Sequence, residues 1–249
     1  MNSFISIFSL LFLFAHIPDA LTQAVRQTKA PWDDKFRQLD EIWPTASAYR
    51  TASGAPGHAY WQQRADYNIS VKLKEEEREL IGDAIIPYTN NSPDTLHYLW
   101  LNLDQNRFAS DSMHVAQRTS NGDKKESYGT LRSGYEYRDG EYGFRLNNVL
   151  DDSGTALDYT VVDTLMRVDL AAPLEPGGKS TFSIGWSHKI IETEILSGRG
   201  GYEHFEEDRN DIFQISQWYP RMAVYSDDEG WHQKNFLGRS EFALEFGDF

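Results

Sequence analysis

The sequence contains no cysteine among its 249 residues, and positive charge is scarce. Without thiols the chain can form neither disulfides nor thiolate zinc sites, and it has no cysteine for N-terminal lipid attachment. Lys and Arg together number 24 against 38 Asp and Glu, which gives a formal net charge of −14. Because phosphates attract basic side chains, this balance argues against nucleic acid as a partner. The fold must therefore be held by core packing rather than by cross-links.

Long apolar runs are also rare, and one stands out at the N-terminus. The stretch FISIFSLLFLFA spans Phe4–Ala15; it suits the hydrophobic region of a signal peptide and is too short to cross a bilayer. We predict a signal peptide over residues 1–24, cleaved after Ala20 or Ala24, with an uncleaved membrane anchor as the alternative. No later stretch is apolar enough to cross a membrane, so no stable span is expected after cleavage. The predicted location is exported, either periplasmic or extracellular.

Residues 25–57 combine a helical period with a linker composition. Trp32, Phe36, Leu39 and Trp43 recur at the spacing of one face of an amphipathic helix. The following TASAYRTASGAPG is small, polar and marked by Gly and Pro, which is typical of a linker. We therefore predict a short helix and a linker in this region.

Residues 58–249 carry apolar and aromatic stretches separated by turn residues. Strands are predicted in YWQQRADYNISVKLK, LIGDAIIPYTNN, TLHYLWLNLDQN, YGFRLNNVL, LDYTVVDTLMRVDL, KSTFSIGWSHKI, IFQISQW, MAVY and EFALEF. Asp104–Tyr137 is predicted to be a surface excursion with a short helix near Ser110–Arg118, and LSGRGGYEHFEEDRND a long loop. Short strands with frequent turns and an aromatic content of 14% favour an all-β fold. We expect an open saddle-like or sandwich antiparallel sheet with a short N-terminal helix.

Motifs for catalysis are missing from the sequence. None of the seven histidines belongs to a His-Glu-x-x-His motif, and no Gly-x-Ser-x-Gly element is present. We therefore predict no catalytic residue, no metal site and no cofactor in this chain. Trp100, Trp186, Trp218 and Trp231 fit either a core or a sugar-stacking platform. The platform leaves a second function open, that of a stand-alone secreted β-sandwich module binding carbohydrate or protein.

Three stretches carry a resemblance to a known family. YTNNSPDTLHYLWLNLDQN, QWYPRMAVYSDDEGW and FLGRSEFALEFGDF resemble the N-terminal β domain of bacterial zinc aminopeptidases of the aminopeptidase N family, peptidase family M1. The Trp-Tyr-Pro element of that domain is matched by Trp218–Pro220. Its Leu-Gly-Arg-x-Glu-Phe-x-Leu-x-Phe-Gly element is matched by Leu237–Gly247. The resemblance runs from about Gly57 to Phe249.

The resemblance implies the N-terminal, non-catalytic portion of an exported zinc metalloaminopeptidase. This portion would pack on the catalytic domain and form one wall of the peptide cleft, so residues 58–249 would be a domain incomplete at its C-terminal end. In the family, a Gln or Glu before Trp-Tyr-Pro helps to bind the free amine of the substrate. The candidates here are Gln217 and Gln214, and the alternative for Gln217 is a structural role at a strand edge. The zinc motif and the Gly-x-Met-Glu-Asn motif are absent, so zinc is expected only in the full-length parent and this chain should be inactive alone.

Overall fold

The computed structural model describes residues 46–117, 125, 127–193, 195, 200–238 and 242–249. The chain divides into two compact units, Met1–His58 and Ala59–Phe249. The signal peptide and the helix predicted over residues 32–43 lie outside the described residues, and both stay predictions. The described end of the first unit is a turn, in which Ser47 Oγ accepts hydrogen bonds from the N–H groups of Tyr49 and Arg50.

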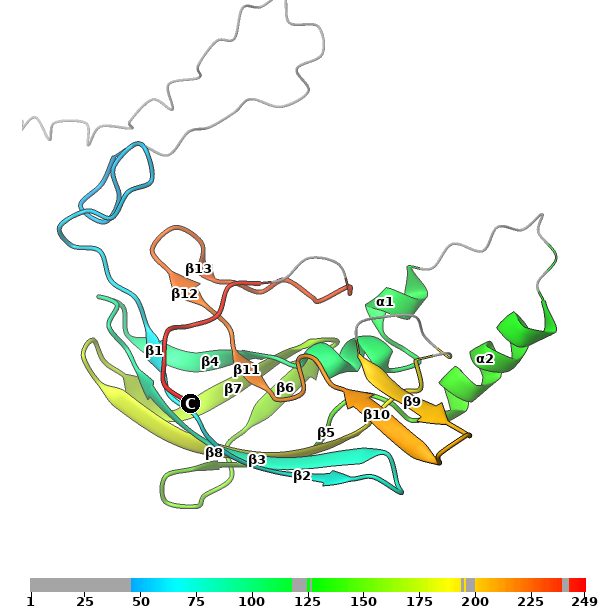
Figure 1. The fold of residues 1–249 in the computed structure, drawn as a ribbon. Coiled ribbons are helices and arrows are strands. Elements are labelled where there is room, and N and C mark those ends of the chain that lie inside the picture. Colours follow the sequence, from blue (N-terminus) through cyan, green and yellow to red (C-terminus); the bar gives the residue numbers. More distant parts are fainter. Residues whose placement is uncertain (1–45, 118–124, 126, 194, 196–199, 239–241) are drawn as a thin grey trace, which may run out of the picture. The chain divides into compact units, whose positions relative to one another are not determined.

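The second unit is built from antiparallel β-sheets (Figure 1). The larger sheet has the order β1-β3-β8-β5, with β2 also paired to β3; its strands are β1 Arg64–Ala65, β2 Asn68–Lys74, β3 Glu79–Thr89, β5 Arg145–Asp151 and β8 Lys179–Lys189. The smaller sheet has the order β11-β4-β7-β6; its strands are β4 Leu96–Asn102, β6 Tyr159–Val162, β7 Leu165–Leu174 and β11 Arg221–Met222. Two further hairpins pair β9 Gly201–Phe205 with β10 Asn210–Gln214 and β12 Tyr225–Ser226 with β13 Gly230–Trp231.

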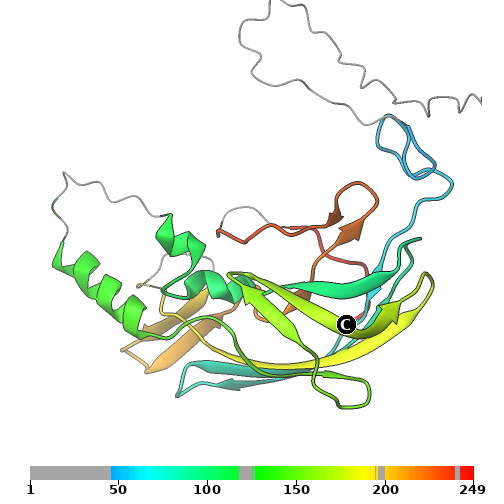
Figure 2. The same cartoon turned by 180° about the vertical axis from the view of Figure 1, so that it is seen from behind.

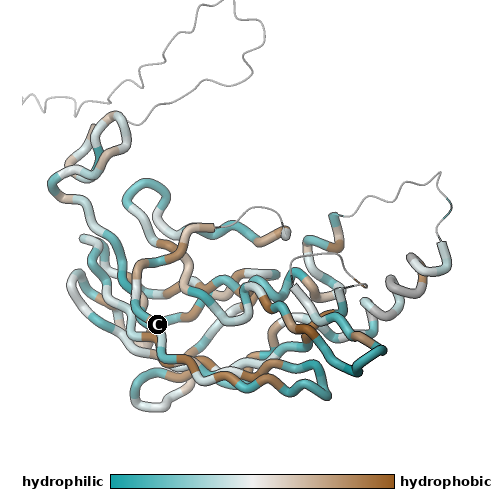
Figure 3. Tube along the Cα trace, in the orientation of Figure 1, coloured by the Kyte–Doolittle hydropathy of each residue, from teal (hydrophilic) through white to brown (hydrophobic). Residues whose placement is uncertain are grey.

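The core of this unit lies between the two sheets (Figures 1 and 2). The larger sheet contributes alternate residues of β3 and β8, and the smaller sheet contributes the buried face of β4 and β7; the principal members are Ala84, Ile86, Tyr88, Phe182, Ile184, Trp186, Leu99, Leu101, Met166 and Val168. Figure 3 shows the hydrophobic stretches along the strands of the larger sheet. The predicted all-β antiparallel fold is therefore confirmed, with the sheets packed as a sandwich.

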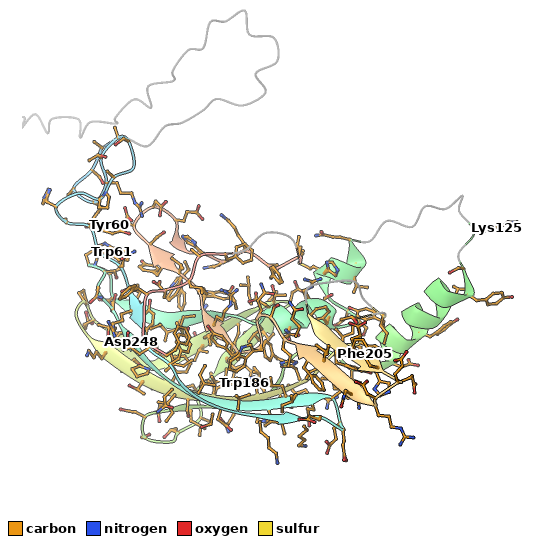
Figure 4. All side chains as sticks on the ribbon, viewed as in Figure 1. Tyr60, Trp61, Lys125, Trp186, Phe205 and Asp248 are labelled. Atoms are coloured by element: carbon orange, nitrogen blue, oxygen red, sulfur yellow. The ribbon has the colours of Figure 1, made fainter. Side chains whose placement is uncertain are left out.

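Close packing in the core explains a glycine in β3. Gly82 pairs with Trp186 across the ladder between β3 and β8. A Cβ atom at Gly82 would lie 2.4 Å from Cζ2 of Trp186. Trp186 is fully buried and lies in the interior of the unit (Figure 4). A side chain at position 82 would therefore displace the largest buried ring of the core.

The helices lie in the excursion between β4 and β5. The 3₁₀ helix η1 spans Asp104–Phe108, and α1 spans Met113–Ala116, where a short helix was predicted. The second helix, α2 at Tyr128–Asp139, was not predicted. Its Tyr128, Leu131 and Tyr135 recur at helical spacing, but they are few, lie among polar residues and are exposed, so they do not form the apolar face of a packed helix.

Several strand and loop predictions were wrong in detail. LDYTVVDTLMRVDL forms two strands, because Asp163 and Thr164 make a two-residue turn between β6 and β7. The predicted loop LSGRGGYEHFEEDRND contains β9, which pairs with β10. The described part of EFALEF forms no strand, since its only ladder contact is a parallel bridge between Phe246 and Arg64. In all of these segments, backbone pairing determines where a strand forms. The alternation of side chains in the sequence does not show that pairing.

A buried amide ties three segments of the sandwich together. Asn90 is fully buried, and its Nδ2 donates hydrogen bonds to the carbonyls of Asp94 at 2.7 Å and Leu174 at 3.0 Å. Its Oδ1 accepts hydrogen bonds from Gln63 Nε2 at 3.0 Å and from Ser92 Oγ at 2.6 Å. Because the bonds to Gln63, Ser92 and Leu174 are buried, the loss of the amide leaves several buried polar groups unpaired.

We expect Asn90→Ala to lower the free energy of unfolding by about 2 kcal/mol, the usual cost of leaving buried polar partners unpaired. Urea denaturation measures the change. The neighbouring Asn91→Ala is the control, because its side-chain bond to the Gln62 carbonyl is exposed, and its cost should stay within about 0.5 kcal/mol. Equal effects at the two positions would show that burial of the Asn90 network is not what matters.

Candidate functional site

The candidate site is the corner of backbone between β10 and β11 (Figure 1). Gln217 belongs to this corner. Gln217 has a φ of +53°, in the left-handed region that side-chain-bearing residues seldom occupy. β10 ends three residues earlier, at Gln214. Non-glycine residues in this region store about 1–3 kcal/mol of strain and persist only where the surroundings fix them. The corner must therefore be held by its neighbours.

Two buried side chains hold the carbonyl groups of the corner. Gln105, in η1, donates a hydrogen bond from Nε2 to the Ser216 carbonyl at 2.7 Å and makes a longer contact of 3.5 Å with the Gln217 carbonyl. Trp186, in β8, donates from Nε1 to the Trp218 carbonyl at 3.1 Å. Three successive carbonyls are thus fixed by side chains from distant parts of the sequence. This explains how the left-handed conformation of Gln217 is maintained.

A buried histidine lies beneath the same corner. His188, in β8, packs edge-on against the ring of Phe144, and its Nδ1 lies 3.3 Å from the Lys189 carbonyl. Its Nε2 is buried and makes no hydrogen bond of good geometry among the described residues. Burial lowers the pKa of His188, and the nearby backbone of Lys189 and Trp218 opposes this shift only in part. The imidazole is therefore neutral at physiological pH and adds no positive charge to the site.

A small cavity of about 50 Å³ opens between these groups. Gln105, His188 and Gln217 line it, together with the glycines Gly200 and Gly201. A cavity of this volume has room for only a few water molecules. It is too small to bind a peptide, and any substrate role of Gln217 must be exercised on the surface of the corner.

Gln214, the second candidate, is placed differently from Gln217. It pairs with Gly201 at the end of β10, is exposed, and does not line the cavity. Along β10, Asp211 and Phe213 face Tyr202 and His204 of β9. Alternation places Gln214 on the opposite face, with the exposed Ile212. The structure thus does not bring the two candidate glutamines together at one point.

The corner also rests on a buried ion pair that the sequence analysis missed. Asp104 Oδ2 accepts hydrogen bonds from Arg221 Nε at 2.8 Å and from Arg221 Nη2 at 2.5 Å. Burial raises the pKa of Asp104, and the Arg221 guanidinium opposes that shift. Asp104 precedes Gln105 in η1, so one short helix supplies both the acid that holds Arg221 and the amide that holds Ser216. The sequence signals for this pair are weak, namely an Asp two residues after the end of β4 and the Arg in QWYPR.

The tryptophans lie mainly in the core. Trp186 is fully buried, and Trp218 and Trp231 pack partly buried against the core. Trp186 is therefore unable to stack on a sugar, which weakens the four-tryptophan platform. Among the described residues, no group of three or more His, Asp and Glu is arranged to hold a metal ion. No described helix is both long enough and apolar enough to span a bilayer.

No family model matches the sequence, and no curated protein matches it. Solved structures with a distant similarity include the M1 zinc metallopeptidase from Deinococcus radiodurans, at 15% identity and a TM-score of 0.32 over 68% of this chain. A mutant of that enzyme bound to a Tyr-Ser-Ala substrate has 14% identity and a TM-score of 0.33 over 73% of this chain. A two-domain M1 zinc metallopeptidase mutant bound to L-arginine has 14% identity and a TM-score of 0.33 over 74%. The matches cover 26%, 28% and 29% of those chains, so this chain spans less than a third of their length.

Proposed function

We propose that this chain is the N-terminal, non-catalytic portion of an exported zinc aminopeptidase, and that Gln217 contributes to binding the free amine of a peptide substrate. The observation that carries the proposal is the rigidly held left-handed corner in the block QWYPRMAVY, the stretch with the most specific resemblance to the aminopeptidase N family. A strained backbone conformation that the surrounding structure holds in place is common at binding sites. Zinc and the catalytic groups would belong to the rest of the parent protein, on which this portion would pack.

The chemistry of Gln217 suits an ammonium group. An amide oxygen accepts hydrogen bonds from –NH₃⁺, and a neutral acceptor discriminates by geometry without requiring a second buried charge. The hydrogen bonds that fix Ser216 and Trp218 supply the positional precision that such recognition needs. Gln217 is the stronger candidate of the two glutamines, because Gln214 lies on an open strand end without comparable support.

The first test of this proposal is the native protein itself. Its intact mass and zinc content, and hydrolysis of an aminoacyl anilide, decide whether a catalytic portion accompanies this chain. A native protein with no zinc and no aminopeptidase activity would sink the proposal. The leader predicted over residues 1–24 is tested by N-terminal sequencing of the exported form.

In an active native protein, we expect Gln217→Ala to raise KM roughly tenfold or more, since a hydrogen bond to a charged group contributes about 1.5–3 kcal/mol. Gln214→Ala should leave KM unchanged. Gln217→Asn is the matched variant, because Asn tolerates the left-handed conformation but retracts the amide from its position. If Gln217→Asn and Gln217→Ala both bind substrate like the wild type, Gln217 has only a structural role.

A further inference from the structure

Strand β6 forms one edge of the smaller sheet (Figure 2), and no second strand of the described residues pairs with it. Within the described structure it pairs only with β7, in an unbroken register, and all of its residues are exposed. Natural edge strands usually carry a Lys, a Pro or a bulge that prevents another chain from pairing. The sequence of β6 is YTVV, which contains no Lys or Pro, and its register with β7 has no bulge, so the open edge is short, at four residues, but regular. The edge is therefore open to strand addition.

The free edge presents backbone groups at two positions. Val162 pairs with Leu165 across the two-residue turn, so this pair carries ladder hydrogen bonds. Hydrogen-bonded and non-hydrogen-bonded pairs alternate along an antiparallel ladder. Val161 and Tyr159 therefore turn their N–H and C=O groups away from β7. Their side chains are also accessible, with exposures of 40% and 43%.

A cavity of about 330 Å³ lies beside this strand. Its lining includes Val161 of β6, Asp163 in the turn that follows, Asp111, and the aromatic residues Tyr142 and Phe144. No Lys, Arg or His is among the described residues that line it. Asp163 accepts one hydrogen bond on Oδ1, from the first N–H of α1 at 3.0 Å, and its Oδ2 is buried with no hydrogen-bond partner among the described residues. The cavity is therefore acidic and partly aromatic.

We propose that β6 binds an extended peptide segment of another protein by strand addition, and that the cavity receives a Lys or Arg side chain of that segment. A residue placed opposite Val161 directs its side chain to the same face as Val161, which lines the cavity. There the two carboxylates attract a cation, and aromatic rings favour its desolvated stem and charge. Gln217 does not line this cavity, so the inference does not depend on the proposed aminopeptidase role.

The acidic residues around β6 indicate which kind of chain can pair with it. Asp158 and Asp163 flank β6 on both sides. A second copy of this chain, paired antiparallel through the same strand, would set acidic residues opposite acidic residues, which is unfavourable. The nearest cation on β7, Arg167, is held by Asp169 with hydrogen bonds of 2.8 and 2.6 Å. The structure therefore favours a basic segment of a different protein over self-association.

The test uses a fluorescent peptide, acetyl-Lys-Val-Thr-Arg-Thr-Val-Lys-amide, titrated against the protein and followed by anisotropy. We expect saturable binding that weakens as salt is added. A control peptide with Glu in place of its three basic residues should bind at least about tenfold more weakly. Equal binding of the two peptides, or no saturable binding of the basic one, would overturn the proposal.

Variants of the protein separate the edge from the cavity. Val161→Pro removes an outward N–H without removing a ladder hydrogen bond, and should weaken binding about tenfold or more. Val161→Thr keeps the N–H and the branched side chain, and should bind like the wild type. Asp111→Asn combined with Asp163→Asn should also lose about tenfold, and Asn tolerates the φ of +54° at position 163.

Circular dichroism and thermal unfolding establish that each variant is folded. Sedimentation of the wild type tests the competing occupant. A dimer that Val161→Pro dissolves would identify a second copy as the occupant of this edge and would overturn the proposal. Binding of the basic peptide that is unchanged in both Val161→Pro and the double Asn variant would overturn it as well.

Discussion

Arg221→Met is expected to lower the free energy of unfolding by about 3–5 kcal/mol, the cost of leaving a buried carboxylate without its cation. The Asp104 side chain is 0% exposed and that of Arg221 is 8% exposed. Asp104 Oδ2 accepts both guanidinium hydrogen bonds, and Oδ1 has no hydrogen-bond partner among the described residues. Urea denaturation at pH 7 measures the loss. At lower pH the loss should shrink, because the stranded carboxyl can take up a proton.

Two further variants separate the ion pair from simple packing. Asp104→Leu combined with Arg221→Met removes both charges and should recover much of the loss, since buried ion pairs are often replaced by apolar residues at little cost. Lys234→Met breaks an exposed pair with Glu229 and should cost less than about 1 kcal/mol. If Arg221→Met costs no more than Lys234→Met, the pair contributes little to stability and the corner is held by its hydrogen bonds alone.

The strands of the larger sheet were predictable because one face of each strand is buried. In β3, the inward residues Leu80, Ala84, Ile86 and Tyr88 alternate with half-buried or exposed ones, and this period is visible in the sequence. The hairpin of β9 and β10 was not predictable in this way. Backbone pairing and a ring contact between Tyr202 and Phe213 hold this hairpin together. Its sequence is rich in acidic residues and shows no apolar alternation that would predict either.

The position of the candidate residue could be predicted from the sequence, but its conformation and its contacts could not. The resemblance selected Gln217, but nothing in the local residues indicates its left-handed backbone. The groups that fix the corner come from far away, since Gln105 and Ser216 are separated by 111 positions and Asp104 and Arg221 by 117. Such contacts arise from the tertiary fold, and no periodicity or spacing rule records them. The edge of β6 was hidden for a related reason, because its run of strand-forming residues continues through the turn at Asp163.

The second prediction with a large effect is that the free energy of unfolding depends on pH through Glu245, near the end of the described chain. Its Oε1 accepts a hydrogen bond from the Tyr225 N–H at 2.7 Å. Burial raises the pKa of Glu245 to about 7, and the Tyr225 N–H opposes the shift only in part. Burial raises the pKa values of Tyr67 and Tyr88, and the charge of Glu245 adds to both shifts. No described cation contributes to the shift of Glu245.

The sign of the effect follows from proton binding. In the unfolded chain Glu245 ionises at its ordinary pKa near 4.5, whereas in the folded chain it keeps its proton up to about pH 7. The folded state therefore binds more protons between these values, and Glu245 lowers stability progressively as pH rises from about 4.5 to 7. The full effect is at most about 3 kcal/mol, since one pKa unit corresponds to 1.36 kcal/mol.

Glu245→Gln should remove this pH dependence, because the amide keeps the acceptor for the Tyr225 N–H and has no proton to lose. The variant should match the wild type near pH 4 and exceed its free energy of unfolding by up to about 3 kcal/mol at pH 7.5, measured by urea denaturation. Glu76→Gln, an exposed carboxylate in the turn after β2, is the matched control and should follow the wild-type curve. Parallel curves for Glu245→Gln and the wild type would show that Glu245 is ionised in the folded protein throughout.

The comparison must be made between variants, because other carboxyls act in the opposite direction. The pKa of Asp66 is lowered, chiefly by the Asp248 N–H and then by Arg64, and that of Asp151 is lowered chiefly by the Ser153 hydroxyl. These groups stabilise the folded state above their unfolded pKa, and this contribution is lost as pH falls through their folded pKa. The wild-type curve therefore combines both signs. Subtracting the Glu245→Gln curve cancels the aspartates and leaves the destabilisation that Glu245 alone develops between about pH 4.5 and 7.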